Sequence, residues 1–269
     1  MGFFRRTYCK YLPPTLLLAC CSLSVTAQQP PRPSCPSRPI VVGLYEFGRY
    51  YQAGAGLDKD VADQLAARSG CKFDLRVMLR SRIWQELQGG GVDLTLSAAA
   101  PAERKVFSWA IPYLWSKNMV ILHKDADAGM RSTADFIAAP SMRLGLARGH
   151  FIGVPYDGFV SQLRNIARVD DADSTDQLFA KFKAGRYQAI LGSQMVYSAY
   201  LKEGEAKIVD WAPAAPRFAT HLLLSKKTFT SVEAKRWEAL MKDMISDGSM
   251  QRMLERYVPP ADAARMLAP

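Results

Sequence analysis

The sequence predicts an α/β protein of two similar lobes, each a mostly parallel sheet flanked by helices, with two hinge crossings between them. Three observations lead to this prediction. Strand-like and helix-like segments alternate from residue 40 onward, an order typical of parallel sheets with helices on their faces. The order helix, glycine, short apolar strand, serine occurs twice, in ELQGGGVDLTLS and FKAGRYQAILGS. Finally, the chain leaves the first lobe near residue 124 and returns near 217–224.

In the first lobe, a helix with Val61 and Leu65 facing inward ends at Gly70, and glycines 89–91 interrupt a second helix. The apolar segments before and after these helices are short enough to be buried strands. The expected elements, in order, are a strand at 40–45, a helix at 57–69, a strand at 73–78, a helix at 81–88, and strands at 92–96 and 118–124.

The second lobe repeats the alternation, and Ser174 or Thr175 is expected to cap its central helix. The chain then returns to the first lobe and ends in two amphipathic helices. The expected strands are 142–147, 187–192, 206–211 and 221–226, and the expected helices are 156–163, 174–185, 193–201, 231–248 and 249–258. We therefore assign 40–123 plus 219–258 to lobe 1, 124–218 to lobe 2 and 259–269 to a C-terminal tail.

The N-terminus has the features of an export signal. Arg5, Arg6 and Lys10 precede an apolar stretch, and the small residues VTA at 25–27 form a cleavage site, which predicts a signal peptide over 1–27. Soluble export to the periplasm is favoured, and a lipid anchor at Cys20 is the alternative, because LLLAC fits a lipobox poorly. Residues 28–39 form a proline-rich leader.

Two cysteines, Cys35 and Cys71, remain after cleavage at residue 27. Each precedes one of two expected neighbouring parallel strands, which begin at the same edge of the sheet. Since exported proteins form disulfides, we expect these two residues to be joined.

Composition excludes several classes of function. Hydrophobic residues make up 49% and charged residues 22%, as in globular proteins. The net charge of +10 falls by three when the signal peptide is removed, and the remaining basic residues are scattered, so nucleic acid is not an expected partner. No metal-ligand spacing, nucleotide-binding motif or catalytic signature occurs, and we expect no cofactor.

Three arginines follow expected strands, at the edge where parallel sheets bind ligands. They are Arg80, Arg104 and Arg148. Arginine binds carboxylate or phosphate through paired charge-assisted hydrogen bonds, although each of these residues could instead form a surface ion pair. Tyr45 and Tyr50, near the end of the first strand, could form a wall of the same site or pack between the lobes.

The order of these segments resembles the family 3 periplasmic solute-binding proteins, the polar amino-acid type with the type II periplasmic binding protein fold. The resemblance lies in GLDKDVADQLAARSG, in WQELQGGGVDLTLSAAAPAERKVFSWAIPYLWS and in KRWEALMKDMISDGSMQRMLERYV. It covers nearly all of residues 40–258. It implies a solute held in the cleft between lobes that close about a hinge.

The resemblance also implies roles for individual residues. Arg104 matches the arginine that clamps the ligand's α-carboxylate, and Ser97 and Ala99 match further contacts, with Ala99 in place of a threonine. Arg80 matches a stacking aromatic. In the second lobe the site includes Arg148, His150 and Ser193. Ser193, or alternatively Gln194, matches the acidic residue that receives the ligand's amino group.

These departures keep or add groups that bind anions and remove acceptors for an ammonium group. We therefore expect a small anionic solute, with an amino acid as second choice if Glu46 or Asp157 supplies the missing charge. The expected protein is a monomer without catalytic activity that works with an inner-membrane ABC permease. The alternatives are an exported enzyme of the cyclohexadienyl dehydratase type, with Glu46 or His150 as acid or base, and a solute sensor independent of transport.

Overall fold

The computed structural model describes residues 1–2, 32–126 and 129–268 of the chain. The expected signal peptide, the lipid-anchor candidate Cys20 and the first part of the proline-rich leader lie outside the described residues. Within the described part, no helix combines the length and the apolar character needed to cross a membrane.

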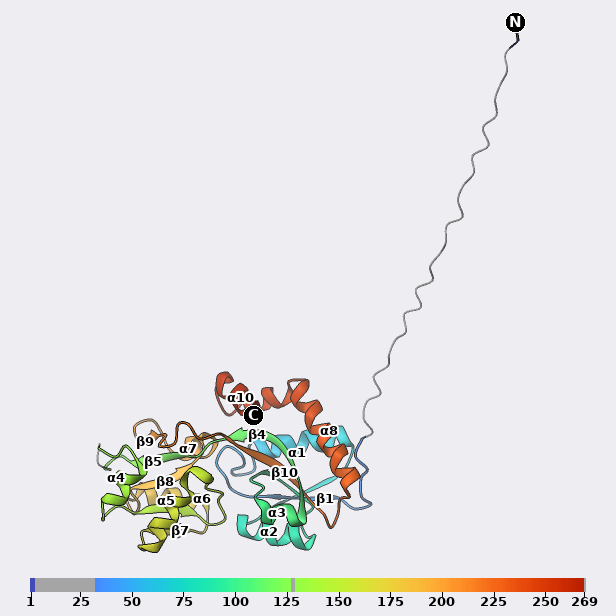
Figure 1. Ribbon diagram of the computed structural model, residues 1–269. Helices are drawn as coiled ribbons and strands as arrows, with labels where there is room; N and C mark the ends of the chain where they lie inside the picture. Colours follow the sequence, from blue (N-terminus) through green and yellow to red (C-terminus); the bar gives the residue numbers. More distant parts are fainter. Residues whose placement is uncertain (3–31, 127–128, 269) are drawn as a thin grey trace. The chain divides into compact units, whose positions relative to one another are not determined.

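The described strands form two five-stranded mixed sheets, which confirms the two-lobed α/β prediction (Figure 1). The first sheet has the order β2-β1-β3-β10-β4, with bounds Phe73–Val77, Ile40–Leu44, Leu94–Ala98, Phe218–Ser225 and Ser108–Ser116. The second has the order β7-β6-β8-β5-β9, with bounds Val169–Ala172, Leu144–Ala147, Ala189–Gly192, Met119–His123 and Ala206–Val209.

The two sheets are built alike. In each, three neighbouring strands are parallel and the fourth strand is antiparallel to both of its neighbours. The predicted site residues lie at or beyond the carboxyl ends of the parallel strands β1, β2 and β3, and of β6 and β8. This is the edge at which α/β sheets bind ligands.

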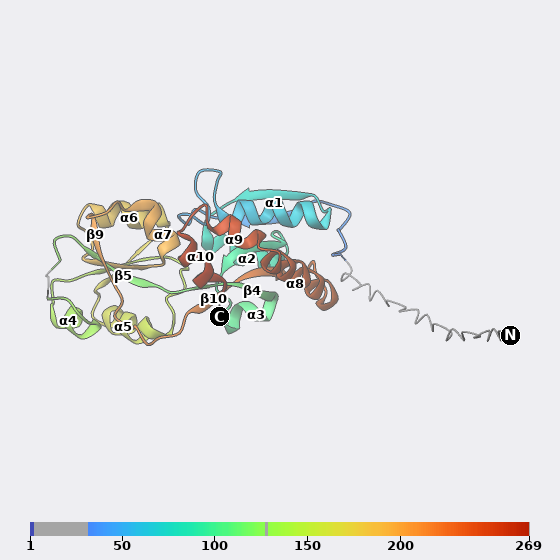
Figure 2. The same ribbon diagram turned by 90° about the horizontal axis from the view of Figure 1, so that it is seen from above.

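Helices cover the sheets. The first lobe carries α1, α2, α3, α8, α9 and α10, with bounds Leu57–Ser69, Arg80–Gly89, Ala102–Phe107, Ser231–Ser246, Ser249–Leu254 and Pro260–Leu267. The second carries α4, α5, α6 and α7, with bounds Thr133–Ala138, Val154–Asn165, Thr175–Lys183 and Gln194–Tyr200. Figure 2 shows α4 and α5 on one side of β5 and α6 and α7 on the other.

Two predicted boundaries differ from the structure. Strand β5, which the prediction placed in the first lobe, pairs with β8 and β9 in the second sheet, so the first crossing lies at 117–118 rather than near residue 124. The segment expected to be a tail contains α10, whose buried Ala263 and Met266 face the first lobe. An amphipathic helix of this kind gains its stability from such packing rather than from intrinsic propensity.

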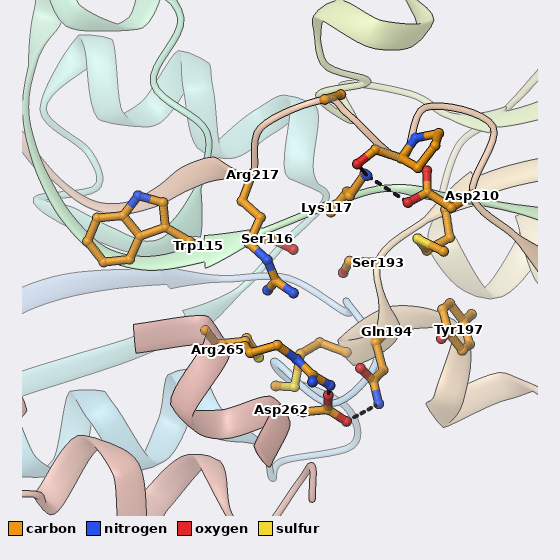
Figure 3. Close-up of a pocket in the computed structure, with 15 residues that line it drawn as sticks. Trp115, Ser116, Lys117, Ser193, Gln194, Tyr197, Asp210, Arg217, Asp262 and Arg265 are labelled. Atoms are coloured by element: carbon orange, nitrogen blue, oxygen red, sulfur yellow. Dashed lines mark hydrogen bonds and ion pairs between the residues drawn. The ribbon is translucent and has the colours of Figure 1, made fainter. Parts of the chain in front are cut away.

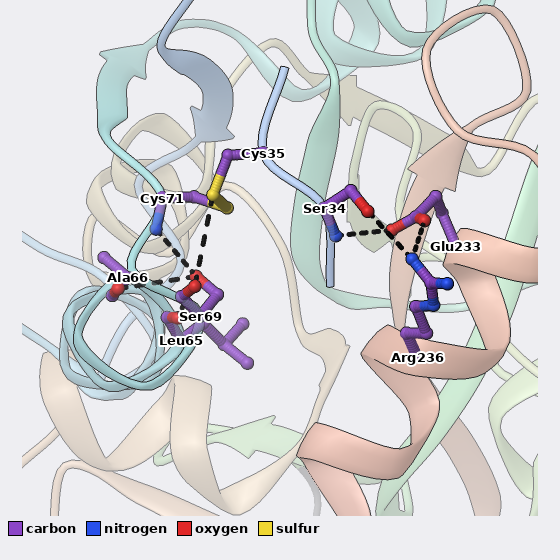
Figure 4. The surroundings of a disulfide bond; sticks show 8 residues. All are labelled: Ser34, Cys35, Leu65, Ala66, Ser69, Cys71, Glu233 and Arg236. Atoms are coloured by element: carbon purple, nitrogen blue, oxygen red, sulfur yellow. Dashed lines mark hydrogen bonds and ion pairs between the residues drawn. A yellow bond between two sulfur atoms is a disulfide. The ribbon is translucent and has the colours of Figure 1, made fainter. Parts of the chain in front are cut away.

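The disulfide between Cys35 and Cys71 is present, as predicted, with Cα atoms 5.2 Å apart (Figure 4). It forms because β1 and β2 are parallel neighbours, with Ile40 beside Phe73. The leader is also held by α8, since the Ser34 amide donates to Glu233 at 2.8 Å and Arg236 donates to the Ser34 hydroxyl at 2.8 Å. The second part of the leader is therefore attached to the lobe at several points.

We expect reduction of this disulfide to lower the free energy of unfolding by about 3 kcal/mol, because the bond limits the entropy of the unfolded chain. Urea unfolding of oxidised and reduced protein measures the difference. In protein without residues 1–27, which contain the other three cysteines, the Cys35→Ser variant should show one reactive thiol, at Cys71, after denaturation. Equal stability of both forms, or no free thiol in the variant, would contradict the prediction.

Candidate functional site

A small cavity of about 20 Å³ lies between the two lobes. The first lobe, the hinge strands and the second lobe all contribute to its lining, which consists of Phe47, Tyr50, Arg80, Ser97, Ala99, Ser116, Asn118, His150, Phe151, Ser193, Phe218 and Thr220. The space suffices for about one water molecule. A solute therefore requires the lobes to separate or a lining side chain to withdraw.

Arg80 is the charged residue among those lining the cavity. Its guanidinium carbon lies 4.2 Å from the centre of the Tyr45 ring and 3.9 Å from that of Phe47. Its Nη2 is shielded from solvent and has no hydrogen-bond partner among the described residues. Burial lowers the pKa of Arg80, and the neighbouring Tyr45 and Asp58 partly offset this effect. The two rings stabilise the cation, but Nη2 has no acceptor among the described residues.

Arg104 stands beside the cavity and spans the two lobes. Its guanidinium carbon lies 3.8 Å from the centre of the Trp84 ring. Nη1 donates to the Ala99 carbonyl at 2.9 Å, and Nη2 donates to the Gly149 carbonyl of the second lobe at 3.4 Å. The weak contact with Gly149 leaves this arginine able to exchange a carbonyl for a solute oxygen.

His150 approaches the cavity from the second lobe, with its ring centre 5.8 Å from that of Phe47. Burial, with the positive charges of Arg80 and Arg104, lowers the pKa of His150 to about 3. The ring is therefore neutral at physiological pH. Its Nε2 is shielded from solvent and has no hydrogen-bond partner among the described residues.

Ser97 is held at the end of β3 by a buried polar network. It has a left-handed backbone with φ 47°, which is strained for a residue other than glycine. Its hydroxyl donates to Asp58 Oδ1 at 2.5 Å, and the Tyr113 hydroxyl accepts from its amide at 2.9 Å. These two partners fix the direction in which β3 ends, and burial raises the pKa of Asp58 to about 7.

The remaining predicted residues divide between the cavity and its surroundings. Tyr50, Ala99 and Ser193 line the cavity, and Tyr45 stacks on Arg80. Glu46 accepts from the Ala53 amide, and Arg148 forms an exposed ion pair with Asp173 at 3.1 Å. Both line a neighbouring pocket of about 350 Å³, which also contains Asp176 and shares Arg80 with the cavity. The structure thus brings most of the predicted residues together but leaves Glu46 and Arg148 outside the cavity.

Several cavity residues were absent from the sequence-based set. Asn118, Phe151, Phe218 and Thr220 lie on or beside the hinge crossings, and Asp58 lies beneath Ser97. Asn118 donates through Nδ2 to the carbonyls of Phe151 and Ile152, each at 2.9 Å. The position of Asn118 at the start of the expected strand at 118–124 was the available signal. Its assignment required knowing where the chain crosses between lobes.

One loop of the first lobe is closely attached to α7 of the second. The Arg49 amide donates to the Met195 carbonyl at 2.7 Å, and Arg49 Nε donates to the Ser198 hydroxyl at 2.7 Å. Gly48 has φ 60°, and a Cβ atom there would lie 2.7 Å from the Met195 oxygen. This position therefore requires glycine both for its backbone conformation and for the close approach of the lobes.

A pocket of about 470 Å³ lies behind the cavity, at the hinge crossings (Figure 3). Lys117, in the first crossing, pairs with Asp210 at 2.6 Å. Asp210 begins the segment 210–217 between β9 and β10, which forms the second crossing, so the two crossings are linked to each other. Gln194 of α7 donates to Asp262 of α10 at 2.9 Å, and Arg265 pairs with the same carboxylate. The C-terminal helix is therefore tied to the second lobe.

Two mixed sheets with hinge crossings and a polar, lobe-bridging cavity define a two-lobed solute-binding protein. The chain belongs to the bacterial extracellular solute-binding proteins, family 3, whose model matches residues 45–260. Among curated protein sequences, none matches the chain. The described residues contain no group of three or more His, Cys, Asp or Glu side chains that could hold a metal ion.

Solved structures with the same fold include amino-acid-binding proteins. The chain is similar to the arginine-, lysine-, histidine-binding protein ArtJ from Geobacillus stearothermophilus, at 17% identity, TM-score 0.67 and coverage of 82% of this chain and 95% of that one. It is also similar to the substrate-binding protein of an amino acid ABC transporter, at 19% identity and a TM-score of 0.65, with coverage of 82% of this chain and 99% of that one. A third similar structure is that of AncCDT-1, an ancestral amino-acid-binding protein described as a precursor of cyclohexadienyl dehydratase. It has 19% identity and a TM-score of 0.67, with coverage of 81% of this chain and 94% of that one.

Proposed function

We propose that the protein captures a small anionic solute, with a carboxylate group, in the cleft between its lobes. The observation that carries the proposal is the charge of the site. Arg80 and Arg104 lie in or beside the cavity, and no Asp or Glu is among the residues that line it. A bound carboxylate would supply the charge and the hydrogen-bond acceptors that Arg80 lacks.

The same charges argue against the ligands of some structural relatives. ArtJ is described as binding arginine, lysine and histidine. A cationic side chain in the present cavity would face Arg80 and Arg104 with no carboxylate to compensate, and an unpaired buried charge is costly. A neutral amino acid remains the second candidate, since its carboxylate could pair with an arginine while its ammonium group would lack a charged partner.

We propose that capture proceeds by hinge closure in the periplasm. The solute would bind the first lobe through Arg104 and the wall formed by Tyr45, and the second lobe would then bring His150 and Ser193 onto it. Uptake by an inner-membrane ABC permease is the expected downstream step, and a monomer suffices for it. One structural relative is described as part of an amino acid ABC transporter, which supports this role.

A dehydratase-like activity is the rival, favoured by the similarity to AncCDT-1. Its candidate acid and base are poorly suited to proton transfer in this cavity. With a pKa lowered to about 3, His150 is a weak base, and Glu46 lies outside the cavity. Turnover of prephenate or arogenate by the purified protein would favour the enzyme, and no turnover together with binding would favour capture.

The test of capture is a thermal-shift screen of dicarboxylates, monocarboxylates and amino acids on protein purified from the periplasm, preceded by native mass spectrometry for any retained solute. We expect a carboxylate to raise the melting temperature of the wild type and of Arg82→Ala, a control on the exposed side of α2. Arg104→Ala should respond weakly. If no anion stabilises the protein, or Arg104→Ala responds like the wild type, the proposal fails.

A further inference from the structure

The cavity between the lobes contains a concentration of buried polar atoms without partners. Ten such side-chain atoms occur among the described residues. Three of them, which we call the open set, belong to residues lining this one cavity: Arg80 Nη2, Asn118 Oδ1 and His150 Nε2. A fourth cavity atom, Tyr50 Oη, lies close to the hydroxyls of Ser116 and Ser193, which stabilise its phenolate form, and is left out of the set. Since buried polar groups are normally hydrogen-bonded, such a cluster indicates a missing ligand whose polar groups complement it.

The hydrogen-bonding direction of Asn118 is fixed by its other contacts. Its amide nitrogen faces two backbone carbonyls, those of Phe151 and Ile152, each at 2.9 Å. Carbonyl oxygens only accept hydrogen bonds, and the donors of Asn118 are on its amide nitrogen, so Oδ1 is the atom left for the cavity. Asn118 therefore offers the ligand an acceptor, whereas Arg80 offers donors. The site needs both an anion and a hydrogen-bond donor from one molecule.

The donor must be uncharged. Asn118 supplies one neutral oxygen, and an ammonium group carries three N–H donors and a full charge. None of the cavity-lining residues is acidic, and Asp58, the buried carboxyl nearby, already accepts from Ser97. Two guanidinium groups lie within or beside the same space, and their charge would repel an ammonium group further. A hydroxyl group meets the requirement at no such cost.

We propose that the solute is a hydroxycarboxylate, whose carboxylate accepts from Arg80 and whose hydroxyl donates to Asn118 Oδ1. This rests on the proposed function and specifies its ligand class. His150 completes the set of contacts. The hydroxyl group thus distinguishes hydroxycarboxylates from deoxy carboxylates and amino acids of similar molecular size.

Matched ligands test the proposal in calorimetric titrations of the mature protein. The triads are L-lactate, propionate and L-alanine; L-malate, succinate and L-aspartate; and L-3-phenyllactate, 3-phenylpropionate and L-phenylalanine. In at least one triad the hydroxy acid should bind about tenfold or more tightly than the deoxy acid, with the amino acid weakest. Replacing the hydroxyl by a methoxy group, as in 2-methoxypropionate for L-lactate, should remove the advantage because the donor is lost.

The Asn118→Ala variant should bind the hydroxy acid and the deoxy acid with nearly equal affinity, whereas Asn165→Ala, at an exposed position on α5, should keep the wild-type ratio. Should Asn118→Ala fail to fold, the methoxy comparison on the wild type decides the same question. Carboxylate binding without a preference for the hydroxy acid, or with preference for the amino acid, overturns this inference alone. Absence of binding in all three triads overturns the proposed function as well.

Discussion

Replacing Arg80 by methionine is expected to weaken carboxylate binding by about a hundredfold or more and, at the same time, to stabilise the ligand-free protein. The guanidinium stacks on Tyr45 and Phe47 but forms no ion pair or hydrogen bond among the described residues. Removing Arg80 takes from the bound carboxylate one of its two cationic partners, and the loss of one partner from a buried charge cluster costs several kcal/mol. Without the ligand, the same substitution removes an uncompensated cation, and methionine can fill the space between the rings.

The two effects are measured separately. Calorimetric titration gives the loss of affinity, and thermal unfolding without ligand should show a melting temperature about 2–4 °C higher than that of the wild type. Arg76→Met is the matched control, because Arg76 is exposed on β2 and pairs with Asp74. It should leave binding unchanged and gain no stability. A variant at Arg80 that binds normally, or that loses both binding and stability, would show that the residue serves the fold rather than the ligand.

The sequence predicted most of the fold because the parallel strands and their helices follow strong local rules. Short apolar strands, glycine-terminated helices such as the one ending at Gly70, and the capping residue Ser174 all appear in the structure. Strand β4 was missed because Pro112 interrupts its pattern. The structure accommodates that proline on an edge strand, where one backbone donor can be absent from the ladder. Because β4 was not predicted, the first crossing was predicted near residue 124, whereas the structure has it at 117–118.

The candidate site could be predicted only in part, for a related reason. Arg80 and Ser97 lie at the ends of β2 and β3, and the edge of one sheet brings such positions together. His150 follows β6 at the corresponding edge of the second sheet, so its position could be predicted within its own lobe. Asn118, Phe151 and Phe218 meet in the cavity because of the way the two crossings and the second lobe pack, which no local pattern records. The same holds for Arg148. It follows β6 as predicted, but its pairing with Asp173 is a tertiary contact.

Stability should depend on pH through Asp58, the buried carboxyl that supports Ser97. Burial is the largest cause that raises the pKa of Asp58 from 3.8 to about 7, and the hydrogen bond from Ser97 and the charge of Arg80 oppose it. Because its folded pKa lies above its unfolded value, the stability contributed by the protonated form is complete below about pH 4. It is lost as the pH rises through 7, by about 4 kcal/mol in total.

His150 complicates the wild-type profile, since it acts in the opposite direction. With its pKa lowered to about 3, it contributes stability above pH 6.5 that is lost as the pH falls. The informative quantity is therefore the difference between Asp58→Asn and the wild type. Asparagine can still accept the Ser97 hydroxyl but does not titrate in this range. We expect the free energy of unfolding of the variant, relative to that of the wild type, to rise by about 1.4 kcal/mol per pH unit between pH 4 and 7. Above pH 7 the difference should stay constant.

Urea unfolding from pH 4.5 to 8.5 measures this difference, with Asp63→Asn as control because Asp63 is exposed on the same helix and pairs with Lys59. The control should run parallel to the wild type. A parallel profile for Asp58→Asn would mean that Asp58 is ionised in the folded protein at low pH. The Ser97 network would then hold a negative charge close to Arg80, and that charge would weaken the attraction of the cleft for anions. The pH profile of one buried carboxyl thus bears directly on the charge that the cleft offers to its solute.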